Sequence, residues 1–235
     1  MQFTSLNGMY GPTKKAIGET EGASDTYWDN VTLLIQSNNE PDGSTNFVDY
    51  SSYGHTVNTT KGAPTHSTAQ AIFGSSSIDL YTSKAIGAVD TDSSFPADFT
   101  LEAWFYCQGV PASGTGFSYV LFSNAAKTYI YPAPTQGIRI NGTEFINGVP
   151  VFPSQQWSHL ALTREGSTLR YFVNGVQLGT GTYSGTANFT NMNLGRYVPN
   201  NNAAFNGYVD QFRLTKDVAR YTENFTPPTQ AFPTS

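Results

Sequence analysis

From about residue 30 onward, apolar and polar residues alternate in short stretches that are separated by turn residues. In the strongest stretch, residues 99–106, every second side chain from Phe99 to Phe105 is apolar and Glu102 falls on the opposite face. This period of two is typical of a β-strand with one buried face. We predict strands over residues 31–36, 77–81, 99–106, 118–123, 137–140, 157–163, 169–173, 176–178, 193–196 and 208–214.

Turn signals punctuate these strands. Asn174-Gly175 stands between two of them, and Asn-Gly favours a two-residue hairpin because both central residues of a type I′ turn take positive φ. Residues 164–167 join a second hairpin. Only residues 216–221 have a helical pattern, with Thr215 placed to cap the helix. Many short strands with one short helix predict an all-β, antiparallel two-sheet sandwich of the jelly-roll type.

The composition agrees with a folded β domain and narrows the partners. Charged residues make up 12% of the 235 residues and aromatic residues 14%, which argues against disorder. The net charge is −5 and there is no basic tract, so a nucleic-acid partner is not expected. The longest apolar runs, such as Val31–Ile35, are too short to span a bilayer, so no membrane insertion is expected.

Residues 1–28 differ from the rest, because they are punctuated by glycines, mix both charge signs and show no sustained period. We interpret them as an N-terminal arm before a domain over residues 29–235, while an additional edge strand remains the alternative. The apolar residues of the arm are too few for a core but suit contact with another protein or another copy. These assembly candidates are Phe3, Leu6, Met9, Tyr10 and Ile17.

Three segments together carry a family resemblance. They are FTLEAWFY at 99–106, WSHLALTR at 157–164 with its continuation to 178, and GYVDQFRL at 207–214 with VARY at 218–221 and FTPP at 225–228. Their order resembles that of the laminin-G-like, concanavalin-A-like lectin and glucanase family. The resemblance covers about residues 29–230 and implies two antiparallel sheets packed as a jelly roll. The form that ends in VARY and FTPP resembles domains common in bacteriophage structural proteins.

The glucanase branch of this family raises the question of catalysis. Glycoside hydrolysis with retention needs two carboxylates about 5–5.5 Å apart, which on a strand calls for acids at alternate positions. Glu102 is the only acid in its strand, and Asp79 likewise stands alone. Motifs of serine hydrolases, phosphate-binding loops and zinc enzymes are also missing. We therefore expect no enzymatic activity and no required cofactor.

Structural roles are expected for several other residues that could carry chemistry. Glu102 is expected to be a satisfied structural acid, and Arg213 and Arg220 are expected to contact local carboxylates or carbonyls. Trp104 and Trp157 are expected to be anchors in the core or between the sheets.

Calcium is the metal that the resemblance suggests, because some relatives bind it through acids in strand-connecting loops. The candidates are Asp42 and Asp49 in predicted loops and Asp210 in the closing strand. Alternatively, Asp42 and Asp49 cap turns and Asp210 makes a structural hydrogen bond. The sequence leaves both interpretations open.

A lectin function would use aromatic rings and short polar side chains on exposed loops. The candidates in two long predicted loops are Tyr129, Tyr131, Tyr197, Asn200 and Asn201. The alternatives for these residues are solvated loop surface or a surface that packs on a neighbouring subunit.

The resemblance and the missing catalytic pair predict a non-enzymatic structural protein of a bacteriophage virion, as capsid decoration or as part of a tail or fibre. Its partners would be other virion proteins and copies of itself. The chain opens without the basic and apolar regions of a signal peptide, so we expect synthesis in the host cytoplasm and release within the virion. The alternative function, compatible with the first, is a glycan-binding module for attachment to the host surface.

Overall fold

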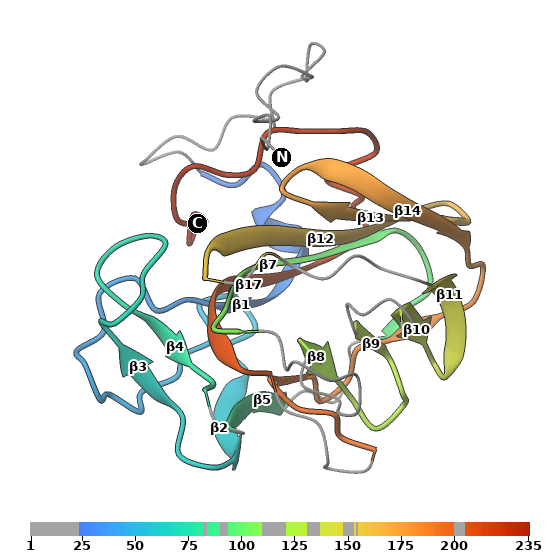
Figure 1. Cartoon of the computed structure of the whole chain (residues 1–235). Helices are drawn as coiled ribbons and strands as arrows, with labels where there is room; N and C mark the ends of the chain where they lie inside the picture. The colour runs from blue at the N-terminus through green and yellow to red at the C-terminus, as the bar shows by residue number, and fades with distance from the viewer. Residues whose placement is uncertain are drawn as a thin grey trace, which may run out of the picture.

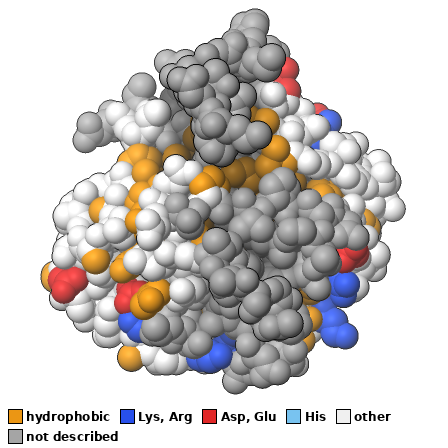
Figure 2. All heavy atoms as spheres, in the orientation of Figure 1, with side chains coloured by type: hydrophobic (Ala, Val, Ile, Leu, Met, Phe, Trp, Pro, Cys, Tyr) orange, Lys and Arg blue, Asp and Glu red, His pale blue; other side chains and the backbone are white. Residues whose placement is uncertain are grey.

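Two antiparallel β-sheets face each other in the structure of this chain (Figure 1). The computed structural model describes residues 24–81, 84–89, 94–109, 121–130, 137–147, 153, 155–199 and 205–235. These residues form the all-β, antiparallel jelly-roll sandwich that the pattern predicts. Charged side chains are few and scattered on the face that Figure 2 shows, in line with their 12% share of the sequence.

Along the chain, groups of one to four consecutive strands alternate between the two large sheets. The eight-stranded sheet has the order β14 (Val176–Thr182), β13 (Thr168–Val173), β12 (Trp157–Glu165), β7 (Phe99–Cys107), β17 (Gly207–Lys216), β4 (Ser77–Asp79) and β3 (Thr65–Ser67), and β1 (Val31–Ile35) also pairs with β17. The seven-stranded sheet has the order β11 (Thr143–Asn147), β10 (Gly137–Ile140), β9 (Tyr129–Ile130), β8 (Phe122–Ser123), β16 (Asn193–Leu194), β5 (Ala85–Val89) and β2 (Thr56–Lys61). A small third sheet pairs β6 (Ser94–Phe95) with β15 (Ala187–Asn188), and a single 3₁₀ turn, η1 (Trp28–Asn30), precedes β1.

The hydrophobic core fills the space between the two large sheets. In β7 the side chains at positions 99, 101, 103 and 105 are at most 1% exposed and belong to this core, which confirms the predicted alternation. Cys107 at the end of the same strand also lies in the core, and burial raises the pKa of its thiol. The opposite face of β7, which carries Glu102, therefore points away from the seven-stranded sheet.

The two predicted hairpins are present. Asn174 (φ 50°) and Gly175 (φ 77°) form a two-residue turn between β13 and β14, and residues 166–167 connect β12 to β13. Position 175 also excludes any side chain, because a Cβ there would lie 1.9 Å from the carbonyl oxygen of Phe225. The backbone N–H of Phe225 donates to the carbonyl of Gly175 at 2.9 Å. The turn therefore also positions residues 217–235, here called the C-terminal segment.

The helix predicted over residues 216–221 is absent, so this prediction was wrong. Asp217 has a φ of 60°, outside the helical region. The hydroxyl of Thr100 in β7 accepts the backbone N–H of Arg220 at 2.8 Å and donates to the carbonyl of Val218 at 2.9 Å. Because the sheet already binds these backbone groups, they are not available for a helical turn.

The outer face of the eight-stranded sheet, turned away from the core, is arranged in four rows across β12, β7 and β17. Residues of one row are opposite one another in the strand register or follow from it across a bulge. The first row is Thr163, Thr100 and Thr215; the second is Ala161, Glu102 and Arg213; the third is His159, Trp104 and Asp210; the fourth is Trp157, Tyr106 and Tyr208.

A bulge in β17 makes this arrangement possible. Gln211 has a φ of 53°, and the register shifts by one residue between Asp210 and Arg213. Val209 before the bulge and Phe212 after it both lie in the core, although they are three residues apart. The extra residue reverses the alternation, so that Asp210 and Arg213 both reach the outer face.

Both ends of the described chain cover the first rows. Thr163 donates its hydroxyl to the carbonyl of Tyr221 at 2.7 Å, and the N–H of Asp25 donates to the carbonyl of Ser235 at 2.8 Å. Trp28 packs beside the cluster of Val31, Leu34 and Phe232. Figure 1 shows the C-terminal segment in dark red along this side of the sheet. The fourth row remains only half-buried.

Candidate binding site on the outer face of the eight-stranded sheet

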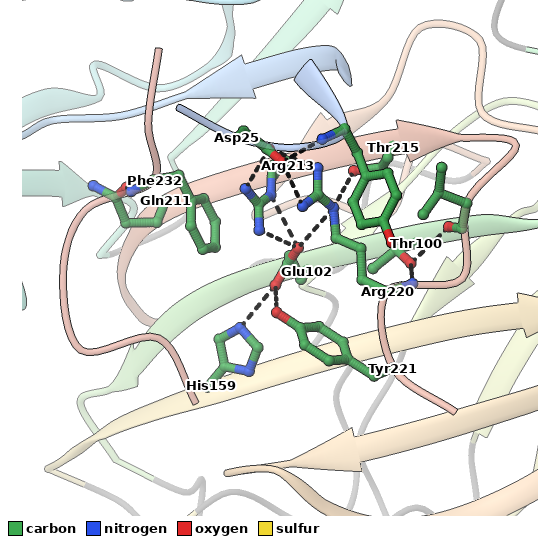
Figure 3. A network of polar contacts seen from close by, with 12 residues as sticks. Asp25, Thr100, Glu102, His159, Gln211, Arg213, Thr215, Arg220, Tyr221 and Phe232 are labelled. Carbon is green, nitrogen blue, oxygen red and sulfur yellow. Dashed lines mark hydrogen bonds and ion pairs between the residues drawn. The ribbon is translucent and has the colours of Figure 1, made fainter. Parts of the chain in front are cut away.

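Glu102 is at the centre of a buried network of polar side chains (Figure 3). Its Oε1 accepts a hydrogen bond from Nε of Arg213 at 3.0 Å. Its Oε2 accepts from the hydroxyl of Tyr221 at 2.8 Å and from Nε2 of His159 at 3.2 Å. Glu102 is 0% exposed. These contacts confirm the structural role that the sequence predicted for this acid.

Asp25 adds a second buried carboxylate to the network. Arg220 donates to both of its oxygens, at 2.9 and 2.6 Å, and Nη1 of Arg213 donates to it at 2.9 Å. Two carboxylates and two guanidinium groups thus balance in charge. Both arginines bind carboxylates, as the sequence predicted, but these come from distant parts of the chain and not from local residues. Asp25 comes from the segment interpreted as the N-terminal arm, so the last residues of that segment are bound to the sheet.

The network keeps both carboxylates in the charged form. Burial alone raises the pKa of Glu102, but the charge of Arg213 and the hydrogen bond from His159 outweigh burial and hold that pKa well below its ordinary range. For Asp25, burial is likewise outweighed by the hydrogen bond from Arg220 and the charge of Arg213, so its pKa is also lowered. The general acid of a glycosidase needs a raised pKa, a requirement that neither group meets.

The fourth row of the outer face offers a different kind of surface. Tyr106 contacts Trp157 on one side and Tyr208 on the other, with ring centroids 5.7 and 5.9 Å apart in edge-to-face geometry. Tyr208 is opposite Asp79 of β4 in the register, and burial together with the negative charge of Asp79 raises the pKa of Tyr208. Tyr81, 40% exposed, follows Asp79 along the chain. The row, here called the aromatic row, combines partly open rings with hydroxyl groups.

The sequence did not single out this surface. Trp157 and Trp104 were expected in the core or between the sheets, but both lie on the outer face. Trp104 is 9% exposed and packs edge-on against Phe73, with ring centroids 5.8 Å apart. Alternation places Tyr106 on the same face as Glu102, but the register of three strands was needed to bring the three rings together.

Two of the predicted glycan-binding residues meet at the other sheet. The rings of Tyr129 and Tyr197 are 5.2 Å apart at an interplanar angle of 89°, and the guanidinium of Arg139 lies 5.6 Å from the ring centre of Tyr129. Tyr129 begins β9 instead of a loop and is only 5% exposed. Their predicted role stays untested, and the other three candidates, Tyr131, Asn200 and Asn201, lie outside the described residues.

The three calcium candidates are held by backbone groups of the chain. Exposed Asp42 accepts the N–H of Thr68 at 3.0 Å, whereas buried Asp49 accepts three backbone N–H groups at 2.8 to 2.9 Å. Asp210 accepts the N–H of Ser37 at 3.0 Å. Within the described ranges, no three His, Cys, Asp or Glu side chains are grouped to hold a metal ion. These contacts are those of the alternative interpretation, in which the aspartates make structural hydrogen bonds.

The predicted assembly residues are not part of the described structure. Phe3, Leu6, Met9, Tyr10 and Ile17 lie outside the described residues, so their contact with a partner stays a prediction. In the part of the chain that is described, no helix is long and apolar enough to cross a membrane.

Comparison with known sequences gives one family match. Residues 79–222 match the laminin-G-type model described as concanavalin A-like lectin/glucanases superfamily. The match spans more than half of the chain and contains β7, β12 and β17. No curated protein sequence matches the chain.

Comparison with solved structures finds related folds at low sequence identity. Domain 4 of AbnA, a GH43 extracellular arabinanase from Geobacillus stearothermophilus solved in complex with arabinotriose, has a TM-score of 0.54 and 20% identity, over 80% of this chain and 92% of that domain. The receptor-binding domain of botulinum neurotoxin type G has a TM-score of 0.49 and 10% identity, over 81% of this chain and 49% of that one. The enzymatically active domain of tailspike protein 2 of bacteriophage CBA120 has a TM-score of 0.47 and 9% identity, over 75% and 32%. At 20% identity the first structure supports a shared fold only. The other two have TM-scores below 0.5, and nothing is inferred from them about this chain.

Proposed function

Because the chain belongs to the concanavalin A-like lectin/glucanases superfamily, we propose that it binds carbohydrate without cleaving it. The observation that carries this proposal is the aromatic row on the outer face. Trp157, Tyr106 and Tyr208 are all half-buried and stand side by side across three strands. The chain ends cover the first rows and Phe73 packs on Trp104 of the third, so the aromatic row is the part of these four rows that stays half-open to a ligand.

Aromatic side chains suit sugar rings for a physical reason. Their large apolar faces pack against the C–H groups of a sugar, while tyrosine hydroxyls can bond its hydroxyl groups. The rings of Trp157, Tyr106 and Tyr208 are already fixed by the strands and by one another. Little side-chain freedom is therefore lost when a ligand binds, which favours affinity.

The absence of cleavage rests on the network around Glu102. Glu102 and Asp25 are buried, are paired with Arg213 and Arg220, and have lowered pKa values. Neither can deliver a proton to a leaving group near neutral pH. We therefore propose a lectin-like protein that binds carbohydrate and does not hydrolyse it.

A glycan array with the full chain, with and without calcium, tests binding. The array should include laminarin, and also arabinotriose, with which a protein of similar fold was solved. Trp157→Ala should weaken binding at least about tenfold, whereas Tyr53→Ala, at a 56% exposed tyrosine outside the row, should not. Binding that survives Trp157→Ala unchanged would remove the aromatic row from the proposal. Release of reducing sugar from a bound glycan would overturn the non-catalytic part.

The setting of this binding remains the one that the sequence predicts. We propose that the protein is part of a bacteriophage particle, because the closing motifs VARY and FTPP resemble those of phage structural proteins. Mass spectrometry of purified virions should then detect the chain.

Deletion of residues 1–23, which keeps Asp25, should preserve the melting temperature and abolish incorporation into particles. Deletion of residues 1–27 should also lower the melting temperature, because it removes a partner of Arg213 and Arg220. Incorporation of the shorter deletion at wild-type copy number would contradict the arm hypothesis.

A further inference from the structure

A pocket of about 620 Å³ lies beside the C-terminal segment. It is bounded by Gln36, Asn38 and Asn39 and by residues 72–74 and 229–235. Phe73, one of its lining residues, packs on Trp104, which is next to Tyr106 on the outer face of β7. The pocket is therefore linked through Trp104 to the third row, one row away from the aromatic row. Its volume falls within the range of about 300–1,000 Å³ that is usual for small-molecule sites.

Hydrogen bonds to the sheet hold the wall formed by the C-terminal segment. Nε2 of Gln36 donates to the carbonyl of Phe232 at 2.7 Å, and the N–H of Phe232 donates to Oε1 of Gln211 at 2.8 Å. The guanidinium of Arg213 lies 3.7 Å from the centre of the Phe232 ring. The wall thus depends on the same arginine that binds Glu102.

The opposite wall is held just as closely. Nε2 of Gln211 donates to Oδ1 of Asn38 at 2.5 Å, and the N–H of Ser75 donates to the carbonyl of Asn38 at 2.6 Å. Gly74 has a φ of +63°, and a Cβ at this position would lie 1.8 Å from that carbonyl oxygen. Only glycine permits this approach, so position 74 cannot take a side chain without moving this wall.

The lining is polar but carries no charged side chain. It combines the side-chain amides of Gln36, Asn38, Asn39 and Gln230 with hydroxyl groups and the ring of Phe73. The amides of Gln36 and Asn38 are bonded to each other, to Gln211 and to Phe232, so those of Asn39 and Gln230 are the ones that can offer hydrogen bonds to the hydroxyl groups of a sugar. The amide oxygen of Gln230 is buried, and no described residue donates to it. That oxygen has almost no accessible surface, so a ligand hydroxyl reaches it only after the Gln230 side chain turns toward the pocket.

The same lining disfavours charged ligands. A carboxylate or sulfate that enters the pocket loses water, and no lysine or arginine lines the pocket to compensate for that loss. We propose, building on the carbohydrate-binding function above, that this pocket takes the uncharged end of a neutral oligosaccharide. Gln230 and Asn39 bind its hydroxyl groups from opposite walls, and Phe73 packs against its ring.

Isothermal titration calorimetry with the full chain tests this inference. The neutral probes are arabinotriose and oligosaccharides from laminarin, and the anionic probes are sialyllactose and a sulfated heparin disaccharide. Neutral probes should bind at least about tenfold more tightly than anionic ones. Gln230→Leu and Asn39→Ala should each weaken neutral binding about tenfold. Gln177→Leu, at an exposed glutamine of β14, is the matched control and should bind as the wild type does.

The outcomes separate this inference from the proposed function. If no probe binds the wild type, the proposed function itself fails. If Trp157→Ala abolishes neutral binding while Gln230→Leu and Asn39→Ala leave it unchanged, the aromatic row binds glycan and the pocket does not. Preferred binding of the anionic probes overturns the neutral specificity alone. Should Gln230→Leu fail to fold, Asn39→Ala decides, because Asn39 is exposed and its loss should not unfold the chain.

Discussion

Asp210 in the third row of the outer face should make the stability of the protein depend on pH near neutrality. Its Oδ1 accepts the N–H groups of Ser37 at 3.0 Å and of Gln211 at 2.8 Å, but no described residue donates to its buried Oδ2. Burial raises its pKa to about 7, and the hydrogen bonds from Ser37 and Gln211 offset burial only in part. The folded protein therefore keeps a proton on Asp210 at pH values where the unfolded chain has released it.

Asp210→Asn removes this titration while it can keep an accepting oxygen in place. The pKa of Asp in an unfolded chain is about 3.9. Because the folded pKa is raised, the stability linked to this group is fully present below about pH 4 and is lost as the pH rises through about 7. One retained proton changes the free energy of unfolding by about 1.4 kcal/mol per pH unit over that range. Relative to the variant, the wild type should lose about 3 kcal/mol between pH 5 and pH 8.

Equilibrium urea unfolding of both proteins at pH 5 and pH 8, followed by far-ultraviolet circular dichroism, measures this change. Asp42→Asn, at an exposed aspartate, controls for the loss of one negative charge. A stability difference between Asp210→Asn and wild type that is the same at both pH values would refute the reasoning. So would a calcium-dependent gain in stability at pH 8 that the wild type shows and Asp210→Asn lacks, because Asp210 would then be a metal ligand.

Two further substitutions test the network and the hairpin. Glu102→Gln should cost about 3–5 kcal/mol near neutral pH, because it leaves the buried charge of Arg213 with one partner fewer. The cost of this substitution should shrink below about pH 4. A lowered pKa in the folded state stabilises the protein above the pKa of the unfolded chain, and that stabilisation is lost as the pH falls. An equal cost by urea unfolding at pH 3 and pH 7 would contradict this. Gly175→Val should lower the melting temperature more than Gly166→Val does. Both positions have positive φ, which strains a valine there by roughly 1–2 kcal/mol, but only at Gly175 would a Cβ also meet a backbone oxygen. Equal losses of melting temperature in the two variants would show that this clash does not matter.

Local patterns in the sequence were enough to predict much of the sheet framework. Alternation over residues 99–106 identified β7 and both of its faces, and Asn174-Gly175 identified a turn with positive φ at both positions. Strands such as β2, which is mostly exposed, have no such apolar alternation and were not predicted. Periodicity reports burial on one face, so it detects only strands that have a buried face.

The same local signal can serve another purpose in the fold. Asn206-Gly207 repeats the dipeptide of the hairpin turn, yet Gly207 begins β17. A Cβ at position 207 would lie 1.9 Å from the carbonyl oxygen of Tyr106 in the neighbouring strand. Glycine is needed there for the close approach of two strands. That requirement depends on a partner about 100 residues away in the sequence, as register pairing sets it.

The sequence by itself determined the all-β class, the family resemblance, the inner face of β7 and the structural role of Glu102. Tertiary structure decided which groups surround that acid, since its partners Arg213, His159 and Tyr221 come from distant parts of the chain. It also decided that residues 216–221 form no helix, because the hydroxyl of Thr100 in the sheet bonds the backbone groups of Val218 and Arg220. The physical reason is that alternation and turn propensity act between neighbouring residues, whereas strand register acts across the fold. The one-residue bulge at Gln211 reverses which side chains face outward in β17, and through that register it sets the buried network, one wall of the pocket and the aromatic row.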